Sequence, residues 1–235
     1  MISFSHTPNE AISLYRKNGF FVEEGLLTDE ECSRAIKLGL QLEGAREGNY
    51  RPCMQPHRQD PEFLKYMMKP SVSAIMRLIL NGEVDGLQTE FFYTIAGTTG
   101  FAAHQDNFFV EAPNNEFASA WMALTDISLE KGSLYGYPGS HVEGKLPTQK
   151  LVGVDVSNQD PNSNNEETVV PLKYTKESFV MKKGSIIFLH GDFVHGSNPN
   201  LTSDPRYVLL CTYIKRGSKF RPGSYAAREP IPLEG

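Results

Sequence analysis

Hydrophobic and polar positions divide the chain into two parts with different periodicity. Before residue 82, apolar side chains recur at helical spacing and predict three helices: Thr28 to about Leu42, Glu62–Met68 and Val72–Leu80. The first helix starts with a capping box, because Thr28 as N-cap is followed three residues later by Glu31. Gly44 and Gly48 are expected to end it, and Asn81-Gly82 to end the third.

From Leu87 onward, short runs rich in β-branched and aromatic residues alternate with Gly, Pro and Asn. Six of these runs predict strands: Leu87–Ile95, Phe117–Asp126, Ser133–Tyr137, Ser178–Met181, Ser185–Leu189 and Tyr207–Ile214. Short strands after a helical start are typical of a β-sandwich or jelly roll with helices on one outer face. We therefore predict a mainly β protein, one domain over residues 1–235, with a helical part at about 8–82 and a β core at about 87–215.

One segment, Val156–Thr168, fits neither pattern. It is polar, rich in Asn and without apolar periodicity. Loops of this length are either lids over functional sites or unstructured insertions. Both interpretations stay open for this segment.

The composition is that of a globular protein, with 40% hydrophobic and 22% charged residues. A net charge of −5 argues against nucleic acid or an anionic membrane as the main partner. The densest basic cluster is interpreted as solvated surface near the C-terminus: Lys215, Arg216, Lys219 and Arg221.

The N-terminal residues lack the apolar stretch of a signal peptide, and no run approaches the roughly 20 apolar residues of a membrane span. Cys32, Cys53 and Cys211 are far apart and form no CxxC pair, which argues against a disulfide framework or a thiolate zinc site. We expect a cytoplasmic protein in a reducing compartment. The sequence predicts no oligomeric state.

His104-Gln105-Asp106 is the sharpest local motif. In a strand, alternate residues point to the same face, so His104 and Asp106 would project together and Gln105 away from them. An imidazole and a carboxylate are two of the three ligands in the 2-His-1-carboxylate triad, which binds iron(II) and leaves positions open for substrates. Taken alone, such a triplet is more often a hydrogen-bonded surface pair.

The stretch after residue 184 supplies further candidates. Its sequence GSIIFLHGDFVHGSNPN offers His190 and His195 as the third ligand, directly after an apolar strand. Arg206 opens the next strand, and an arginine entering the interior needs an anion as partner. Its planar fork suits a carboxylate, so a dicarboxylate co-substrate would meet this need.

These motifs together resemble the phytanoyl-CoA dioxygenase family of iron(II)/2-oxoglutarate-dependent oxygenases. The similarity runs from about Gly19 to Ile214 and is carried by HQDN at 104–107, WMALTD at 121–126, KGSL at 131–134, YPGSH at 137–141, HGSNPN at 195–200 and Arg206. The opening, NGFFV at 18–22 and LTDEE at 27–31, is also similar to the family. The resemblance implies a double-stranded β-helix, a cupin-like jelly roll, with iron between its two sheets.

The resemblance also implies roles for single residues. His104, Asp106 and His195 match the family's metal ligands, and His195 is preferred to His190 for this reason. The remaining matches concern the co-substrate: Arg206 pairs with the distal carboxylate of 2-oxoglutarate, Ser197 assists it, and Trp121 lines the pocket in some members. Members often place Lys or Asn on the strand before the His-x-Asp motif. That residue is missing here. Tyr93 or Thr94 is expected to replace its contact, and Gln88 is expected to face the pocket.

Other polar residues keep more than one interpretation. His190 is expected in the core or beside the metal ligands, and His141 is expected to shape a turn. Trp121 could equally fill the core. Glu90 and Glu111 are either substrate contacts or exposed acids at strand ends.

The function that follows is a dioxygenase using Fe(II), 2-oxoglutarate and molecular oxygen to hydroxylate or otherwise oxidise a small-molecule metabolite, with release of succinate and CO2. Halogenases of this superfamily replace the acidic ligand by a small residue, so the retained Asp106 favours hydroxylation or a related oxidation. Substrate contacts are expected from Asn107–Val110, Tyr135–Tyr137 and the 156–168 loop. The alternatives are a non-catalytic metal- or ligand-binding jelly roll and a zinc hydrolase, which lacks a motif here.

Overall fold

A computed structural model of the chain describes residues 2–43, 52–151 and 166–233. The helices are α1 (Pro8–Asn18), α2 (Asp29–Gly39), η1 (Pro56–Arg58), η2 (Pro61–Phe63), α4 (Leu64–Met67), α5 (Pro70–Ile79), α6 (Asn107–Val110) and η3 (Ser140–Glu143). The strands are β1 (Phe20–Glu23), β2 (Cys53–Met54), β3 (Val84–Thr94), β4 (Phe117–Ala123), β5 (Leu134–Gly136), β6 (Thr148–Lys150), β7 (Glu166–Thr168), β8 (Glu177–Phe179), β9 (Ile186–His190), β10 (His195–Ser197), β11 (Arg206–Lys215) and β12 (Ile231–Pro232). Gly44, Gly48 and most of the 156–168 segment lie outside the described residues.

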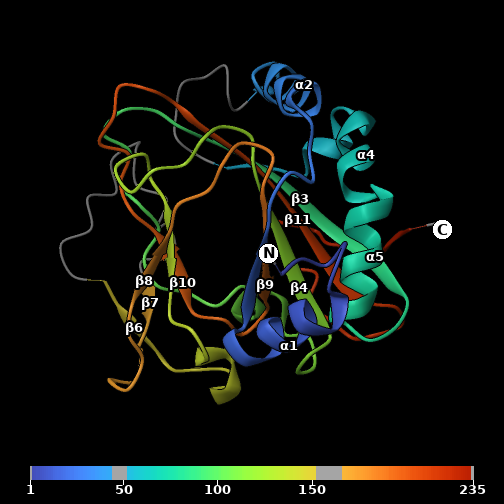
Figure 1. Ribbon diagram of the computed structural model, residues 1–235, viewed down its shortest axis with the longest axis vertical. Helices are drawn as coiled ribbons and strands as arrows, with labels where there is room; N and C mark the ends of the chain where they lie inside the picture. The colour runs from blue at the N-terminus through green and yellow to red at the C-terminus, as the bar shows by residue number, and fades with distance from the viewer. Residues whose placement is uncertain (1, 44–51, 152–165, 234–235) are drawn as a thin grey trace.

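The strands form a large sheet that faces a smaller one. The large sheet has the order β1-β9-β4-β11-β3-β12, with β2 also pairing β3, and the smaller sheet has the order β10-β5-β8. Helices α4 and α5 lie on one side of the large sheet, and the smaller sheet lies on the other (Figure 1). This arrangement confirms the predicted jelly roll with helices on one outer face. None of the helices within the described ranges is long and apolar enough to cross a membrane.

Helix α2 begins as its sequence predicts. The Thr28 hydroxyl accepts a hydrogen bond from the Glu31 backbone at 3.2 Å, and the Glu31 carboxylate accepts one from the Thr28 backbone at 2.8 Å. The helix ends at Gly39, three residues before the predicted end. The predicted helix over 62–68 is instead divided into η2 and α4, because Pro61 and the Asp60 side chain, which caps the Glu62 backbone, start a 3-10 turn first.

Both faces of the large sheet are buried, which explains why its central strands are apolar on both sides. Along β3, Phe91 and Tyr93 pack into the core under the helices, whereas Phe92 packs into the core between the two sheets. Along β4, Met122 belongs to the helix-side core and Trp121 to the inter-sheet core. This alternation shows which side chains of each strand can reach a site between the sheets.

All six predicted strands are present, each within three residues of its predicted ends. Strands β1 and β10 were not predicted, although β1 is the edge strand of the large sheet and β10 carries His195. Both are short, so neither provides the repeated alternation by which a strand is recognised in sequence.

Candidate metal centre

Backbone pairing brings two of the three predicted ligands together. The His104 backbone N–H donates to the His195 carbonyl at 2.8 Å, and the His195 N–H donates to the His104 carbonyl at 3.0 Å. The expected strand through the His-x-Asp motif is wrong, because His104 forms only this isolated bridge. Asp106 has helical backbone angles and immediately precedes α6. The chain turns from the bridge into α6, and this turn replaces strand alternation in bringing His104 and Asp106 together.

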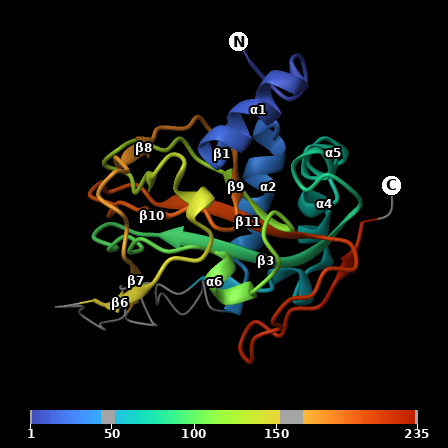
Figure 2. The same cartoon turned by 90° about the horizontal axis from the view of Figure 1, so that it is seen from below.

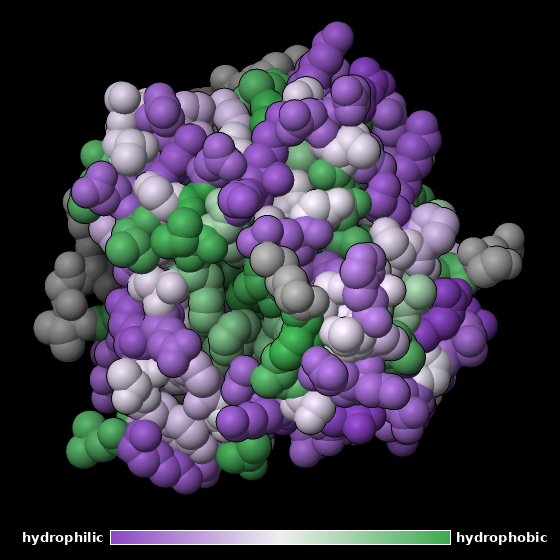
Figure 3. Space-filling model, in the orientation of Figure 1, coloured by the Kyte–Doolittle hydropathy of each residue, from purple (hydrophilic) through white to green (hydrophobic). Residues whose placement is uncertain are grey.

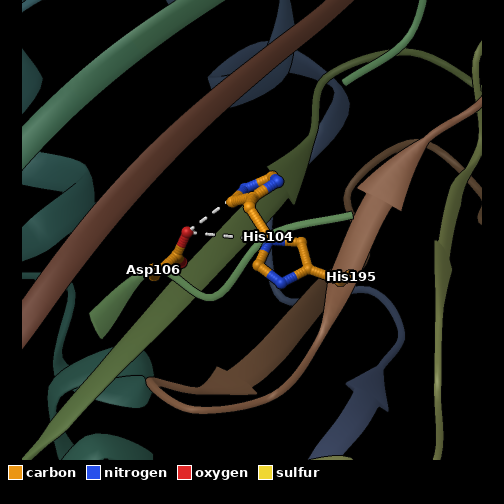
Figure 4. Close-up of side chains that lie close together, drawn as sticks. All are labelled: His104, Asp106 and His195. Atoms are coloured by element: carbon orange, nitrogen blue, oxygen red, sulfur yellow. Dashed lines mark ion pairs between the residues drawn. The ribbon is translucent and has the colours of Figure 1, made fainter. Parts of the chain in front are cut away.

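The side chains of His104, Asp106 and His195 converge between the two sheets, with ligand atoms within 4.8 Å of one another (Figure 4). The Asp106 Oδ1 atom lies 3.6 Å from His104 Nε2 and 3.7 Å from His195 Nε2. His104 Nδ1 lies 2.8 Å from the Ala102 carbonyl, and His195 Nδ1 lies 3.0 Å from the Phe193 carbonyl. A carbonyl only accepts, so each Nδ1 carries a proton and each Nε2 is the atom that faces Asp106.

Asp106 is held as a carboxylate. Burial opposes its ionisation, but His195, His104 and the Ser119 hydroxyl outweigh burial and keep the pKa of Asp106 well below its ordinary range. The Ser119 hydroxyl donates to Oδ2 at 2.6 Å, which leaves Oδ1 directed at the histidines. Burial also lowers the pKa of His195 to about 4, although Asp106 acts in the opposite direction. Burial lowers the pKa of His104, but the Asp106 carboxylate outweighs burial and raises that pKa. Two imidazoles and one carboxylate in this arrangement fit a divalent iron ion.

Amide side chains on either side of Asp106 fix the turn that carries it. Gln105 is 1% exposed, and its side chain donates to the carbonyls of Gly144 and Asp192 at 2.8 and 2.6 Å. The Asn107 side chain donates to the Asp192 carboxylate at 3.0 Å. Gln105 therefore points away from the ligands, as its place in the motif suggested. No sequence pattern indicates Ser119, Asp192 or the bracing role of these amides.

Arg206 and Ser197 lie in the inter-sheet space. Arg206 is 2% exposed, donates to the Gly132 carbonyl, and has its guanidinium carbon 5.7 Å from the centre of the Trp121 ring. The Ser197 hydroxyl accepts a hydrogen bond from the Phe101 backbone at 2.9 Å. A Cβ atom at Gly132, where φ is +68°, would lie 3.0 Å from the guanidinium. The KGSL motif thus needs a glycine here for both its backbone conformation and its contact with Arg206.

Tyr93, Thr94 and Gln88 do not form one group. Thr94 lies opposite Arg206 in the β3–β11 register and can serve the same end of the site. Tyr93 packs into the helix-side core. This placement argues against its expected role in the co-substrate pocket. Gln88 lies opposite Thr212, six residues along β3 from Thr94, and is therefore close to the metal ligands rather than to Arg206.

His190 and His141 belong to a separate buried cluster. His190 Nδ1 accepts a hydrogen bond from the Asp192 backbone at 3.0 Å, and its Nε2 lies 3.0 Å from the Asn115 side-chain oxygen. His141 Nε2 lies 2.9 Å from the Arg16 carbonyl. Neither His190 nor His141 lies with the group formed by His104, Asp106 and His195, which agrees with the preference for His195 over His190 as the third ligand.

Glu90 and Glu111, each with two possible interpretations from the sequence, have different surroundings. Glu111 is a surface residue that pairs with Arg221 at 3.1 Å. Glu90 lies in the middle of β3, so its interpretation as a strand-end acid is wrong. Burial and the charge of Asp106 raise the pKa of Glu90 to about 7, against the effect of Arg228. Glu90 is therefore a neighbour of the metal centre.

The basic cluster near the C-terminus is more than solvated surface. Arg216 pairs with Asp85 at 2.9 Å, and the Arg221 side chain donates to the Phe108 carbonyl in α6 at 2.8 Å. The C-terminal segment therefore runs beside α6, the helix that directly follows Asp106 (Figure 2).

On the face of the molecule seen in Figure 1, hydrophilic residues surround a smaller hydrophobic area (Figure 3).

Comparison with known proteins finds the same fold and family. The family model for phytanoyl-CoA dioxygenase (PhyH) matches residues 15–208. Phytanoyl-CoA dioxygenase 1 of Oryza sativa subsp. japonica is 27% identical over 219 residues, which cover 91% of this chain and 73% of the rice protein.

Two solved structures from nogalamycin biosynthesis are similar to almost the whole chain. The non-heme alpha ketoglutarate dependent carbocyclase SnoK has a TM-score of 0.76 at 20% identity, over 100% of this chain and 96% of its own. The epimerase SnoN, in complex with Fe3+, alpha ketoglutarate and nogalamycin RO, has a TM-score of 0.74 at 19% identity, over 97% of this chain and 95% of its own. At this level of identity, these two similarities establish the fold alone.

Proposed function

This chain belongs to the phytanoyl-CoA dioxygenase family of iron- and 2-oxoglutarate-dependent oxygenases, and we propose that it hydroxylates or otherwise oxidises a small-molecule metabolite at a centre formed by His104, Asp106 and His195. It is an oxidoreductase whose cofactor is iron and whose co-substrates are 2-oxoglutarate and oxygen. Bound iron(II) supplies the oxidising chemistry, with 2-oxoglutarate converted to succinate and CO2.

One observation carries the assignment of the ligands. In both histidines, Nδ1 donates a hydrogen bond to a backbone carbonyl, and Nε2 faces the same oxygen of Asp106. At 3.6 and 3.7 Å, both Nε2 atoms lie beyond ordinary hydrogen-bond distance of the Asp106 Oδ1 atom, so neither histidine satisfies this oxygen. A divalent cation among the three atoms would satisfy all of them.

Arg206 and Ser197 are the proposed anchors for the distal carboxylate of 2-oxoglutarate. The buried guanidinium brings a full positive charge into the inter-sheet space, where an anion stabilises it. Thr94 lies opposite Arg206 and is proposed to line the same end of the site, with Trp121 as its wall. The distance between this anchor and the metal ligands would set the orientation of the co-substrate.

Retention of Asp106 supports hydroxylation or a related oxidation, because the carboxylate occupies the position that a halide would need. The braces from Gln105 and Asn107 hold this carboxylate in place before any cofactor binds. The non-catalytic alternative is not favoured, since the family match covers most of the chain.

The test is an anaerobic titration of the protein with iron(II) and then with 2-oxoglutarate, followed by oxygen. We expect a visible charge-transfer band, which His104→Ala abolishes and Arg206→Ala weakens, and succinate after oxygen is admitted. His6→Ala is the matched control, because His6 is an exposed histidine outside the site. Failure of the unaltered protein to bind either iron or 2-oxoglutarate would refute the proposed function.

A further inference from the structure

A row of polar side chains crosses the large sheet beside the proposed metal ligands. In the strand register, Ser119 of β4 lies opposite Thr212 of β11, and Thr212 lies opposite Gln88 of β3. Ser119 hydrogen-bonds Asp106, so this row is at the level of the metal centre. Neighbouring strands are about 4.8 Å apart, which places Thr212 and Gln88 within roughly 10 Å of Ser119.

Apolar residues close one side of this row. The pairing of β3 with β11 shifts between Thr212 and Tyr213, so Leu87 is an extra residue in β3. Leu87 packs with Ile214 and Phe117 in a separate small core. The polar row is therefore the last level at which a ligand could lie between the sheets.

Two atoms in the row have no protein partner among the described residues. These atoms are Gln88 Oε1 and Thr212 Oγ1, and both are fully buried. A buried polar atom is costly unless a hydrogen bond satisfies it, so an unmatched pair beside a candidate active centre indicates a ligand or ordered water.

Glu90 lies one level further along the same face of β3. It is partly exposed, although both its neighbours in the strand, Thr89 and Phe91, are fully buried. Its carboxylate accepts a hydrogen bond from the Gln88 amide, which fixes the Gln88 side chain. Arg228 and Asp106 are among the charged groups that act on it. Glu90 and Gln88 therefore present two neighbouring acceptor oxygens beside the metal centre.

This polar group is too far from Arg206 to serve the distal carboxylate of the co-substrate. Thr212 is six residues from Arg206 along β11, which corresponds to about 20 Å of extended strand. Carboxylate and amide oxygens would also repel an anion. A partner for this group is therefore a molecule other than the distal carboxylate, and the partly exposed Glu90 is the member that such a molecule can reach.

We propose that the substrate is a polar small molecule whose hydroxyl or amino groups donate hydrogen bonds to Glu90 and Gln88, with the Thr212 hydroxyl as a third contact. The inference rests on the proposed function, since it takes the metal centre as the point of reaction. An unbranched acyl chain would leave these buried oxygens unmatched and cover a carboxylate with hydrocarbon. It is disfavoured as a substrate for this reason.

The experiment uses the iron- and 2-oxoglutarate-loaded protein and two panels of compounds. One contains cyclitols, amino sugars and hydroxylated amino acids, and the other contains straight-chain fatty acids and their coenzyme A thioesters. Succinate release above the level without substrate is measured for each compound. We expect at least tenfold stimulation by members of the polar panel and less than twofold stimulation by the acyl panel.

Glu90→Gln and Thr212→Val then test the contacts with the best polar substrate. We expect Glu90→Gln to raise the substrate KM at least tenfold for an amine and about threefold for a polyol, because glutamine keeps an acceptor but loses the charge. Thr212→Val should raise the KM about threefold. The control is Glu177→Gln, an exposed carboxylate on β8, which should change no parameter.

Iron binding and the 2-oxoglutarate charge-transfer band, measured on the same samples, show whether each variant is folded and loaded. Stimulation by the acyl panel alone, no stimulation by any compound, or a substrate KM within twofold of wild type in Glu90→Gln would overturn the inference. In each of these cases the proposed function survives if iron and 2-oxoglutarate still bind. Loss of both binding signals in the unaltered protein would instead refute the proposed function itself.

Discussion

We predict that the folded protein is less stable in mild acid than at neutral pH, because His190 stays neutral in the folded state. Its Nδ1 accepts a hydrogen bond from the Asp192 backbone N–H at 3.0 Å, so protonation of Nδ1 would break this bond. The side chain is also 5% exposed, and an imidazolium there would be poorly solvated. Burial, with a smaller contribution from His141, lowers the pKa of His190 from 6.5 to about 4.

The sign of the effect follows from proton uptake. Between pH 6.5 and about 4, His190 binds a proton in the unfolded chain but stays neutral in the folded one. The unfolded state therefore gains stability as the pH falls through this range. With these two pKa values, the loss in the free energy of unfolding between pH 7 and pH 5.5 is about 1.2 kcal/mol.

The assay is urea unfolding at pH 7 and pH 5.5 of the metal-free wild type and of His190→Gln. Glutamine does not titrate, and its amide can both accept and donate at the same place. Contributions from the metal ligands are common to both proteins and cancel in the difference. Wild type should lose about 1.2 kcal/mol more than the variant on acidification. Equal losses would refute the claim that His190 is held neutral.

Four further predictions concern the metal ligands, their support, the proposed co-substrate anchor and the capping box of α2. His195→Ala should abolish iron binding in a titration while His190→Ala retains it, and equal losses would contradict the choice of His195. Ser119→Ala should weaken iron affinity about tenfold, because it removes a hydrogen bond that orients a ligand; unchanged affinity would show that Asp106 needs no such support. Arg206→Lys should raise the KM for 2-oxoglutarate about tenfold by losing the planar fork, and Thr28→Ala should lower the free energy of unfolding by about 1 kcal/mol in a urea titration.

The parts of the fold that were predictable from sequence are those with a local cause. The capping box at Thr28 determines where α2 starts, and apolar runs with turn residues at their ends locate the six predicted strands. The split of the second helix into η2 and α4 follows from Asp60 and Pro61, whose effect was visible in the sequence but was outweighed by the apolar pattern. Strand β10 is only three residues long, and its partners β5 and His104 lie far away in the sequence.

The candidate site was predictable in its residues but not in its geometry. His104, Asp106 and His195 could be named because their types and order resemble a family, whereas the argument from strand alternation fails for them. Alternation requires an extended backbone, and Asp106 has helical angles at the start of α6. The three side chains meet because His104 and His195 pair through their backbones and because Ser119 holds Asp106, and both contacts depend on tertiary structure.

The same limit explains why the acceptors beside the metal centre were not recognised as a group. Gln88, Glu90 and Thr212 are ordinary polar residues in two strands. Alternation places Gln88 and Glu90 on the same face of β3, but it does not say whether this is the helix side or the inter-sheet side. Gln88 and Glu90 share the face of β3 that carries Phe92, which packs between the sheets. The register of β3 with β11 places Thr212 beside them. A pattern of period two identifies which residues share a face, but only the packing of helices on the other face decides that this face carries the chemistry. The common place of these three side chains is therefore encoded in strand register, which a single sequence does not reveal.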